Sequence, residues 1–384
     1  MNRFSLLHYM QLLAAVSLAA PLLANADVRY TVTEVAGAGS NVSDLNNLGQ
    51  VVGSLRSGDS YHAFVYTNGD LTDLGTFGGT DSHAYAINDH GQVAGSAFDT
   101  PTNGPWRGFT GFVYSGGSMS AIRETGNSFA YGINNNGTVV GAMTVGKPGD
   151  VTHDHAYTYT NGVFTDLGTL PIGDFSYAYA INNTGDVVGA AGNVFNGAPN
   201  FPHDPFLYRD GTMTSLGNLG GPWSTARSIN DHGQIVGYLG TDSNVNPDDI
   251  YPSTAFLYEN GVMRNLGGPS PLWSSAAYDI NNLGQIVGSA GLGDFLSHGF
   301  LYENGAMVDL NVLIDPESGW VIQDAAAIND LQQIAATACR GDVCQAVRLD
   351  LVPAVPEPAA YALLLGGLLL GWRRGGARRY WKTR

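Results

Sequence analysis

Few residues in this 384-residue sequence have the type and spacing of a chemical site. One stretch alternates oxygen-bearing side chains with other residues, at Asp242, Asn244, Asn246 and Asp248. Calcium loops use this alternation, but they need a glycine where Pro247 stands and a bidentate acid further along. A solvated acidic loop is therefore the simpler interpretation. These four residues are kept as a weak calcium candidate, and no other metal or cofactor is expected.

Three histidines, His62, His155 and His298, recur at equivalent places in the chain. A metal would need them together, whereas equivalent places in a repeat lie in separate structural units. The sequence also lacks a nucleophile elbow, a P-loop and the zinc-protease and paired-cysteine zinc signatures. Two carboxylates could still meet in the folded chain, as in glycoside hydrolases, but sequence does not give their separation. We therefore assign no catalytic residue.

The elements that would position any site come from one phrase that the chain repeats. "AYAINDHGQVAGSA", residues 84–97, returns with the same asparagine at Asn46, Asn88, Asn134, Asn182, Asn230, Asn281 and Asn329. The spacings are 42, 46, 48, 48, 51 and 48 residues. A glycine follows three residues later in every copy but the last, which has Gln332. Asn-x-x-Gly predicts a tight turn, because asparagine bonds nearby backbone and glycine accepts a positive φ.

A second phrase, "HAFVYTNG" from His62, follows in each of the first six copies and leads into "LTDLG" or a similar stretch. Its residues are apolar on both faces of a strand, and Asn-Gly pairs such as Asn68-Gly69 predict hairpin turns. Each of these six copies thus contains four short strands in a meander. A period in the forties with four strands per unit is typical of a β-propeller blade.

The ends of the repeat indicate how many blades there are. The last copy lacks a fourth strand, and an unpaired strand, Arg29–Val35, precedes the first copy. We therefore predict an all-β protein: a seven-bladed β-propeller over residues 27–352, with four-stranded antiparallel blades and a ring closed by the N-terminal strand. Closure removes exposed sheet edges. An open solenoid is the alternative, but it does not explain the spare strand.

Both chain ends have the composition of targeting segments. Residues 1–26 combine Arg3, the apolar run Leu12–Leu23 and a small-residue site, Ala24-Asn25-Ala26, which predicts a signal peptide cleaved after Ala26. A buried core helix is the alternative. Residues 353–384 contain an apolar run, Ala359–Trp372, followed by a cluster of arginines. Fourteen apolar residues are short for a membrane span, which needs about 20.

Charge and cysteine content narrow the possible partners. Between Asp27 and Pro358 there are 33 acidic and 10 basic residues, a net charge of −23. This excludes a nucleic-acid binder, which needs a basic face. The only two cysteines, Cys339 and Cys344, lie close together in "CRGDVC". In an oxidising compartment their expected state is one local disulfide.

Long segments of variable sequence are expected on one face of the ring, where second strands lead to third strands and one blade leads to the next. Long loops on a rigid scaffold commonly carry binding sites. Aromatic residues in them are the ligand-binding candidates: Trp106, Phe195, Trp223, Tyr251 and Trp273. Exposed aromatics beside Asn and Asp suit sugar rings. The alternative is that they cap the ends of the blades.

Two families are similar to parts of this sequence. The paired phrases, with His62-Ala63-Phe64, resemble the HAF repeat of bacterial extracellular proteins over most of the mature chain. Pro356-Glu357-Pro358, the apolar run and the basic end with Arg373 and Arg374 resemble the PEP-CTERM sorting signal of Gram-negative bacteria. That resemblance implies an exosortase partner, a transient membrane anchor, removal of the tail and a final place at the cell surface or outside the cell. A plain C-terminal membrane anchor is the alternative.

The sequence therefore predicts an exported surface or matrix protein that binds exopolysaccharide or other biofilm components without catalysis. A hydrolase or lyase acting on extracellular polysaccharide is the alternative, and a structural spacer is a third interpretation. Asp, Glu, His or Tyr side chains converging on the centre of the ring, with perturbed pKa values, would favour the enzyme.

Overall fold

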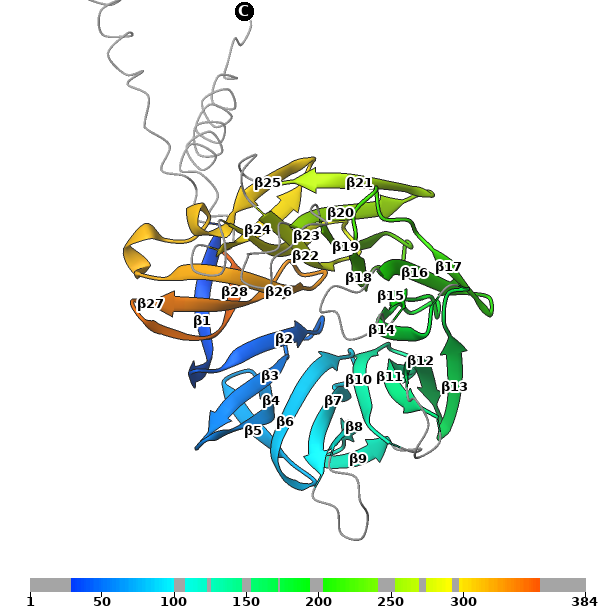
Figure 1. Ribbon diagram of the computed structural model, residues 1–384. Coiled ribbons are helices and arrows are strands. Elements are labelled where there is room, and N and C mark those ends of the chain that lie inside the picture. Colours follow the sequence, from blue (N-terminus) through cyan, green and yellow to red (C-terminus); the bar gives the residue numbers. More distant parts are fainter. Residues whose placement is uncertain are drawn as a thin grey trace, which may run out of the picture. The chain divides into compact units, whose positions relative to one another are not determined.

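Seven four-stranded antiparallel sheets form a ring of blades in the computed structural model (Figure 1). The structure describes residues 29–99, 108–122, 126–146, 153–171, 173–193, 203–240, 253–268, 274–291 and 297–352. The chain divides into two units, Met1–Asp350 and Leu351–Arg384, and nearly all described residues belong to the first. The predicted seven-bladed β-propeller is thus confirmed.

Six blades each take four consecutive strands, ordered from the centre of the ring outward. Blade 1 contains β2 (Asn41–Leu45), β3 (Val51–Ser57), β4 (Ser60–Thr67) and β5 (Asp70–Gly75). Blade 2 contains β6 (Gly78–Ile87), β7 (Val93–Asp99), β8 (Gly108–Ser115) and β9 (Ser118–Ile122). Blade 3 contains β10 (Ser128–Ile133), β11 (Val139–Val145), β12 (His153–Thr160) and β13 (Val163–Gly168). Blade 4 contains β14 (Phe175–Ile181), β15 (Val187–Gly192), β16 (His203–Arg209) and β17 (Thr212–Ser215). Blade 5 contains β18 (Ser224–Ile229), β19 (Ile235–Gly240), β20 (Ser253–Glu259) and β21 (Val262–Gly267). Blade 6 contains β22 (Ser274–Ile280), β23 (Ile286–Gly291), β24 (Ser297–Glu303) and β25 (Ala306–Asp309).

Blade 7 joins the two ends of the repeat. Its sheet order is β26 (Val321–Ile328), β27 (Ile334–Arg340), β28 (Val343–Leu351) and then β1 (Tyr30–Ala38), which lies beside β28 in Figure 1. Two short 3-10 turns, η1 (Leu310–Val312) and η2 (Pro316–Ser318), precede β26. Arg29 forms an ion pair with Glu303 of blade 6, and a disulfide joins Cys339 and Cys344 across β27 and β28. The predicted closure by the N-terminal strand is confirmed.

Two faces of the ring differ in their connections. The turn face carries the short Asn-x-x-Gly turns and the hairpins between third and fourth strands. The long-loop face carries the connections from second to third strands and from each blade to the next. Asn68 and Gly69 both have positive φ, 50° and 100°, which asparagine and glycine tolerate best. This chemistry explains why Asn-Gly recurs at the outer hairpins.

The blades pack through apolar residues that alternate along their strands. Between blades 1 and 2, Val52, Ala63 and Leu74 contact Ala84 and Phe112, and all five are buried. A glycine in the second strand of blades 1 to 6, such as Gly95, allows the backbone of the innermost strand to approach closely. A Cβ on Gly95 would lie 2.2 Å from the His83 carbonyl oxygen and 2.5 Å from the Phe112 ring.

The repeated asparagine holds neighbouring blades together. Its Oδ1 accepts hydrogen bonds within its own turn; for Asn46 these come from the backbone N–H groups of Leu48 and Gln50. Its Nδ2 donates to the backbone carbonyl of the equivalent asparagine in the next blade, at 2.9–3.1 Å. The last of these bonds runs from Asn329 back to Asn46. Seven buried asparagines therefore form a closed ring of hydrogen bonds.

Parts of the predicted domain organisation lie outside the described residues. These are the signal peptide, residues 1–26, and the sorting tail, residues 353–384. Within the described residues, no helix has the length and apolar character needed to cross a membrane.

The asparagine ring predicts a large cost for one substitution. Asn230→Ala removes three hydrogen bonds within its turn, from the His232 and Gln234 N–H groups and to the Gln234 side chain, and also the bond to the Asn281 carbonyl. We expect a loss of about 2–4 kcal/mol in the free energy of unfolding, measured by urea denaturation. Asn136→Ala is the control, because Asn136 is exposed and its side chain donates one bond, to Asn183. Equal losses in the two variants would contradict the role of the ring.

Candidate functional site

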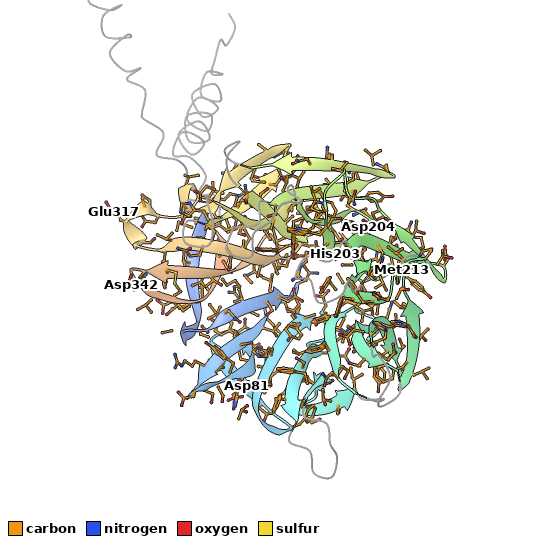
Figure 2. The ribbon with its side chains drawn as sticks, viewed as in Figure 1. Asp81, His203, Asp204, Met213, Glu317 and Asp342 are labelled. Atoms are coloured by element: carbon orange, nitrogen blue, oxygen red, sulfur yellow. A yellow bond between two sulfur atoms is a disulfide. The ribbon has the colours of Figure 1, made fainter. Side chains whose placement is uncertain are left out.

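A central cavity of about 520 Å³, which we call the channel, lies where the seven blades meet. Its wall consists of the last residues of the seven innermost strands and of the first residues of the turns that follow. The labelled Glu317 and Asp342 lie far from it, at the rim of blade 7 (Figure 2). A volume of this size is typical of small-molecule sites, which occupy about 300–1,000 Å³. The channel is the candidate functional site.

A β-bulge in every innermost strand determines which side chains line the channel. The pairing register shifts by one residue, three positions before the repeated asparagine. Bulges redirect side chains at the point where they occur. The bulged residues, which all line the channel, are Ser43, Tyr85, Tyr131, Tyr179, Arg227, Tyr278 and Ala326.

Three neighbouring tyrosines form an aromatic wall on one side of this layer. The ring centroids of Tyr85 and Tyr131 are 5.3 Å apart, and those of Tyr131 and Tyr179 are 5.4 Å apart. Burial raises the pKa of all three phenols, so they are neutral near pH 7. The wall therefore presents apolar ring surface and uncharged hydroxyl groups to the channel.

The hydroxyl groups of this layer differ in their partners. Tyr85 accepts a hydrogen bond from Ser96 at 3.1 Å, and Tyr278 shares one with Ser289 at 2.9 Å. No hydrogen bond joins the hydroxyls of Tyr131 and Tyr179 to another residue in the described part of the chain. These two groups are available to a molecule in the channel.

Arg227 occupies the same layer in blade 5. Its guanidinium lies over the Tyr179 ring, 4.8 Å from the centroid. Of the residues that line the channel it is the only basic one, beside five aspartates.

Two aspartates lie one position further along the innermost strands. Asp44 accepts hydrogen bonds from the backbone N–H groups of Leu45 and Ile87, both at 2.8 Å. Asp279 accepts from the Ser228 hydroxyl at 2.6 Å and from the Ile328 N–H at 2.8 Å. Ile87 and Ile328 lie on the innermost strands of the next blades, where no further strand is present to accept hydrogen bonds from their N–H groups. Each carboxyl therefore supplies the missing acceptor.

The environment raises the pKa of both carboxyls. Removal from bulk water is the main cause for each, although both side chains keep some exposure to the channel. For Asp44, repulsion by Asp279 adds to the effect, and its pKa lies well above the usual value. The pair thus has the perturbed titration that can mark a catalytic centre.

A second hydrogen-bonded ring encircles the channel at the turn face. The residue after each repeated asparagine is Asn or Asp, and its side-chain oxygen accepts from the backbone N–H of its counterpart in the preceding blade at 2.8–2.9 Å. Asp89 also accepts from the side-chain amides of Asn47 and Asn135. The acids of this ring therefore serve the closure of the propeller.

Aromatic rings continue from the channel wall toward the long-loop face. The Phe129 ring stacks on Tyr131 with an interplanar angle of 3°, and Tyr177 stacks on Tyr179 at 15°. Further ring contacts, with centroids 5.5–6.3 Å apart, extend this series across blades 1 to 5. We call the series the aromatic arc: Tyr61, His83, Tyr85, Phe109, Phe129, Tyr131, Phe175, Tyr177, Tyr179, His203, Trp223 and Tyr238. It joins the channel to the face on which a binding site was expected.

The candidate histidines lie on the outer strands, away from one another. His62, His155 and His298 each form a hydrogen bond through Nδ1 to the aspartate of the following strand: Asp73, Asp166 and Asp309 respectively. His83 bonds the Ser54 hydroxyl at 2.8 Å, but Ser54 is only 2% exposed and cannot act as a nucleophile toward a substrate. These pairs fasten strands and blades together.

Most ligand-binding candidates from the sequence fall outside the described residues. This applies to Trp106, Phe195, Tyr251 and Trp273, and to the calcium candidate Asp242, Asn244, Asn246 and Asp248. Trp223 is described: it is half-buried in the aromatic arc, with its ring near His203 and Tyr238. Among the residues that can be inspected, no three His, Cys, Asp or Glu residues converge as a metal site would require.

Sequence reasoning missed the channel residues, although the signal was present in the repeated phrase. Tyrosine stands three positions before the asparagine in four copies, as in "AYAIN" and "AYDIN", and arginine replaces it in "ARSIN". From sequence alone the phrase served to place a turn and to count the blades, and its tyrosines were not singled out. Polar or aromatic residues at a fixed place in the innermost strand could have identified the channel wall.

Comparisons with known proteins support the fold and leave the function open. The sequence profile of a family described as protein of unknown function (DUF3466) matches residues 124–267, which span blades 3 to 5. No curated protein sequence matches the chain. The chain is similar in structure to the β-propeller domain of the Trilobed protease from Pyrococcus furiosus, described as having an open velcro topology. The two share 11% identity with a TM-score of 0.53, over 83% of this chain and 99% of that one.

A second similar structure is the acylaminoacyl peptidase of Pyrococcus horikoshii, with 12% identity and a TM-score of 0.50 over 84% of this chain. The chain spans 53% of that peptidase. At these identities the similarity shows the propeller fold alone. The closed blade 7 distinguishes this chain from the open velcro described for the first of them.

The buried carboxyls predict a pH-dependent difference in stability. Because the pKa of Asp44 is higher in the folded state than in the unfolded state, its protonation favours folding at low pH. That contribution is lost as pH rises through the folded-state pKa. Relative to the native protein, Asp44→Asn should therefore become more stable as pH rises through the folded-state pKa of Asp44, which lies well above the usual aspartate value, in urea titrations. A difference in stability between Asp44→Asn and the native protein that stays the same at every pH would disprove the assignment.

Proposed function

We propose that this protein is a non-enzymatic binding module for polysaccharide, with the channel and the aromatic arc as its binding surface. The observation that supports this proposal best is the unbroken series of aromatic rings from the wall of Tyr85, Tyr131 and Tyr179 to Trp223 near the long-loop face. Exopolysaccharide or another matrix component is the ligand class.

The chemistry of the surface matches that of a sugar. A pyranose has apolar faces that stack on aromatic rings and a rim of hydroxyls that needs donors and acceptors. Tyr131 and Tyr179 supply the ring faces together with hydroxyls that have no partner among the described residues. Ser43 and Arg227 add polar groups to the same layer.

Binding is favoured over hydrolysis by the hydrogen bonds of the two central carboxyls. Asp44 and Asp279 each accept two bonds from the protein, and each caps the edge of a neighbouring blade. They therefore have a structural role that explains their presence. Their raised pKa values are the observation that supports the second candidate function, an extracellular glycoside hydrolase or lyase with these carboxyls as acid and base.

The aromatic wall predicts the outcome of a matched pair of substitutions. Tyr131→Leu keeps apolar volume but loses the ring face, and we expect it to weaken oligosaccharide binding about 2- to 10-fold, since an aromatic contact contributes about 0.5–1.5 kcal/mol beyond its buried area. Tyr131→Phe keeps the ring and should bind nearly as the native protein does. Titration calorimetry after screening on a polysaccharide array provides the measurement.

The same samples separate the two candidate functions. They would be assayed for new reducing ends and for unsaturated products. Binding without products supports the module. Products that disappear in Asp44→Asn and Asp279→Asn would establish the enzyme instead, and unaltered binding by Tyr131→Leu would exclude the channel.

Export is the second part of the proposal. Residues 1–26 have the pattern of a cleaved signal peptide, and residues 353–384 that of a PEP-CTERM tail recognised by an exosortase. The negative charge of the intervening chain and the Cys339–Cys344 disulfide suit a surface or extracellular location.

Export predicts the ends of the mature protein. Mass spectrometry of protein released by a Gram-negative host with an exosortase should find Asp27 as the first residue and no arginine-rich tail. In a host without exosortase the tail should remain and the protein should stay with the membrane fraction. Retention of the tail in both hosts would favour a plain membrane anchor.

A further inference from the structure

We infer that Arg227 makes the channel selective for acidic saccharides, by binding the carboxylate of a uronic acid residue stacked on the tyrosine wall. This inference rests on the proposed function, and it adds the chemical class of the ligand and the residue that recognises it.

The position of Arg227 places its charge within the tyrosine layer. It is the bulged residue of blade 5, between the bulged tyrosines of blades 4 and 6, and its guanidinium lies 4.8 Å from the centroid of the Tyr179 ring. It also influences the titration of both Tyr179 and Tyr278, as a cation close to each phenol would. The side chain is half-buried, and no other basic residue lines the channel.

Arg227 differs from every other arginine in the described residues. The others form an ion pair or a hydrogen bond with a carboxylate or a backbone carbonyl: Arg29, Arg56, Arg209, Arg264, Arg340 and Arg348. No such bond or ion pair joins the Arg227 guanidinium to any residue whose position is described. A guanidinium has five N–H donors in a planar fork and, away from bulk water, is stabilised by an acceptor that matches this fork.

A carboxylate is the acceptor that fits best. It can bind the guanidinium through two parallel hydrogen bonds, a charge-assisted geometry stronger than bonds to neutral hydroxyls. A uronic acid carries this carboxylate on a ring that can stack against a tyrosine. The unpartnered hydroxyls of Tyr131 and Tyr179 lie in the same layer and can bond the sugar rim.

The acids of the channel do not remove this preference. Asp89, Asp231 and Asp330 belong to the hydrogen-bonded ring at the turn face. Asp44 and Asp279 are held in their neutral form more readily than ordinary aspartates, because burial raises their pKa.

The acids that lie toward the long-loop face also have partners; Asp81, for example, accepts from the Tyr61 N–H and the Thr80 hydroxyl. Asp154 accepts from Thr144 and Tyr177, at 2.9 and 3.0 Å, and Asp324 accepts from the Thr337 N–H at 3.0 Å. An anionic sugar entering from that face would meet Arg227 as the one unpaired charged group in the tyrosine layer.

The test compares each acidic oligosaccharide with its neutral methyl ester. Oligomers of galacturonic, mannuronic and glucuronic acid would be titrated into the full chain by calorimetry at fixed ionic strength, together with their esters. We expect at least one acid to bind about 10- to 100-fold more tightly than its ester, the range for hydrogen bonds to a charged group. Arg227→Gln should abolish the preference, so that the acid and its ester bind this variant equally.

Three further variants make the result decisive. Arg56→Gln removes the same charge from an exposed arginine and should leave the preference intact. Arg227→Lys should keep part of the preference, because it retains the charge without the fork. Arg227→Ser introduces the residue found at this place in blade 1, Ser43, so it should fold as the native chain does and lose the preference.

The failures of the two proposals can be told apart. If neutral oligosaccharides bind through Tyr131 but no acid is preferred over its ester, the Arg227 inference falls and the binding module stands. If Arg227→Gln weakens acid and ester equally, Arg227 is a general packing residue and the inference also falls. If no saccharide binds and Tyr131→Leu has no effect on any titration, both proposals fall together.

Discussion

The ring of asparagine side chains is the interaction on which the rest of this structure depends. Each of the seven residues folds its own turn through Oδ1 and bonds the next blade through Nδ2, and the last bond returns from Asn329 to Asn46. All seven are no more than 5% exposed, so each bond is made away from solvent, where a missing partner is costly. One residue type thus determines both the local turn and the spacing of the blades.

The site follows from the same constraint. The innermost strand of every blade has no further strand to pair with, so its N–H groups need other partners. Asp44 and Asp279 satisfy two of them across the gap to the next blade. The bulge beside this position turns Tyr85, Tyr131, Tyr179 and Arg227 toward the channel. The residues that could bind a ligand are therefore carried by the segment that closes the ring, which gives them a rigid base.

Much of the fold could be predicted from local sequence because each blade repeats the same local chemistry. Asn68-Gly69 requires a hairpin with positive φ, and the phrase around Asn46 requires a turn before an apolar strand. The spare strand before the first repeat had one place to pair, beside the incomplete last blade. These inferences depend only on contacts within a blade and on the number of strands. Both can be read from the order of residues along the chain.

The candidate site could not be predicted in the same way. Tyr85, Tyr131 and Tyr179 are 46 or 48 residues apart in sequence, and their ring contacts exist because three blades meet at the centre. The aromatic residues chosen from the sequence were those in long segments, and of them Trp223 alone lies in the part of the chain that the structure describes. The channel is instead lined by tyrosines of the repeated phrase. Their sequence does not show whether they face a neighbouring blade or the central axis.

By itself, then, the sequence determined the repeat, the strand order, the number of blades and the way in which the ring closes, since these depend on turn chemistry and alternation along the chain. Tertiary structure alone decided that Asp44 and Asp279 share one poorly solvated channel, that a bulge directs Arg227 toward its centre, and that Arg227 lacks a counter-charge among the described residues. Those properties arise from distances between blades, and such distances exist only after the ring has closed.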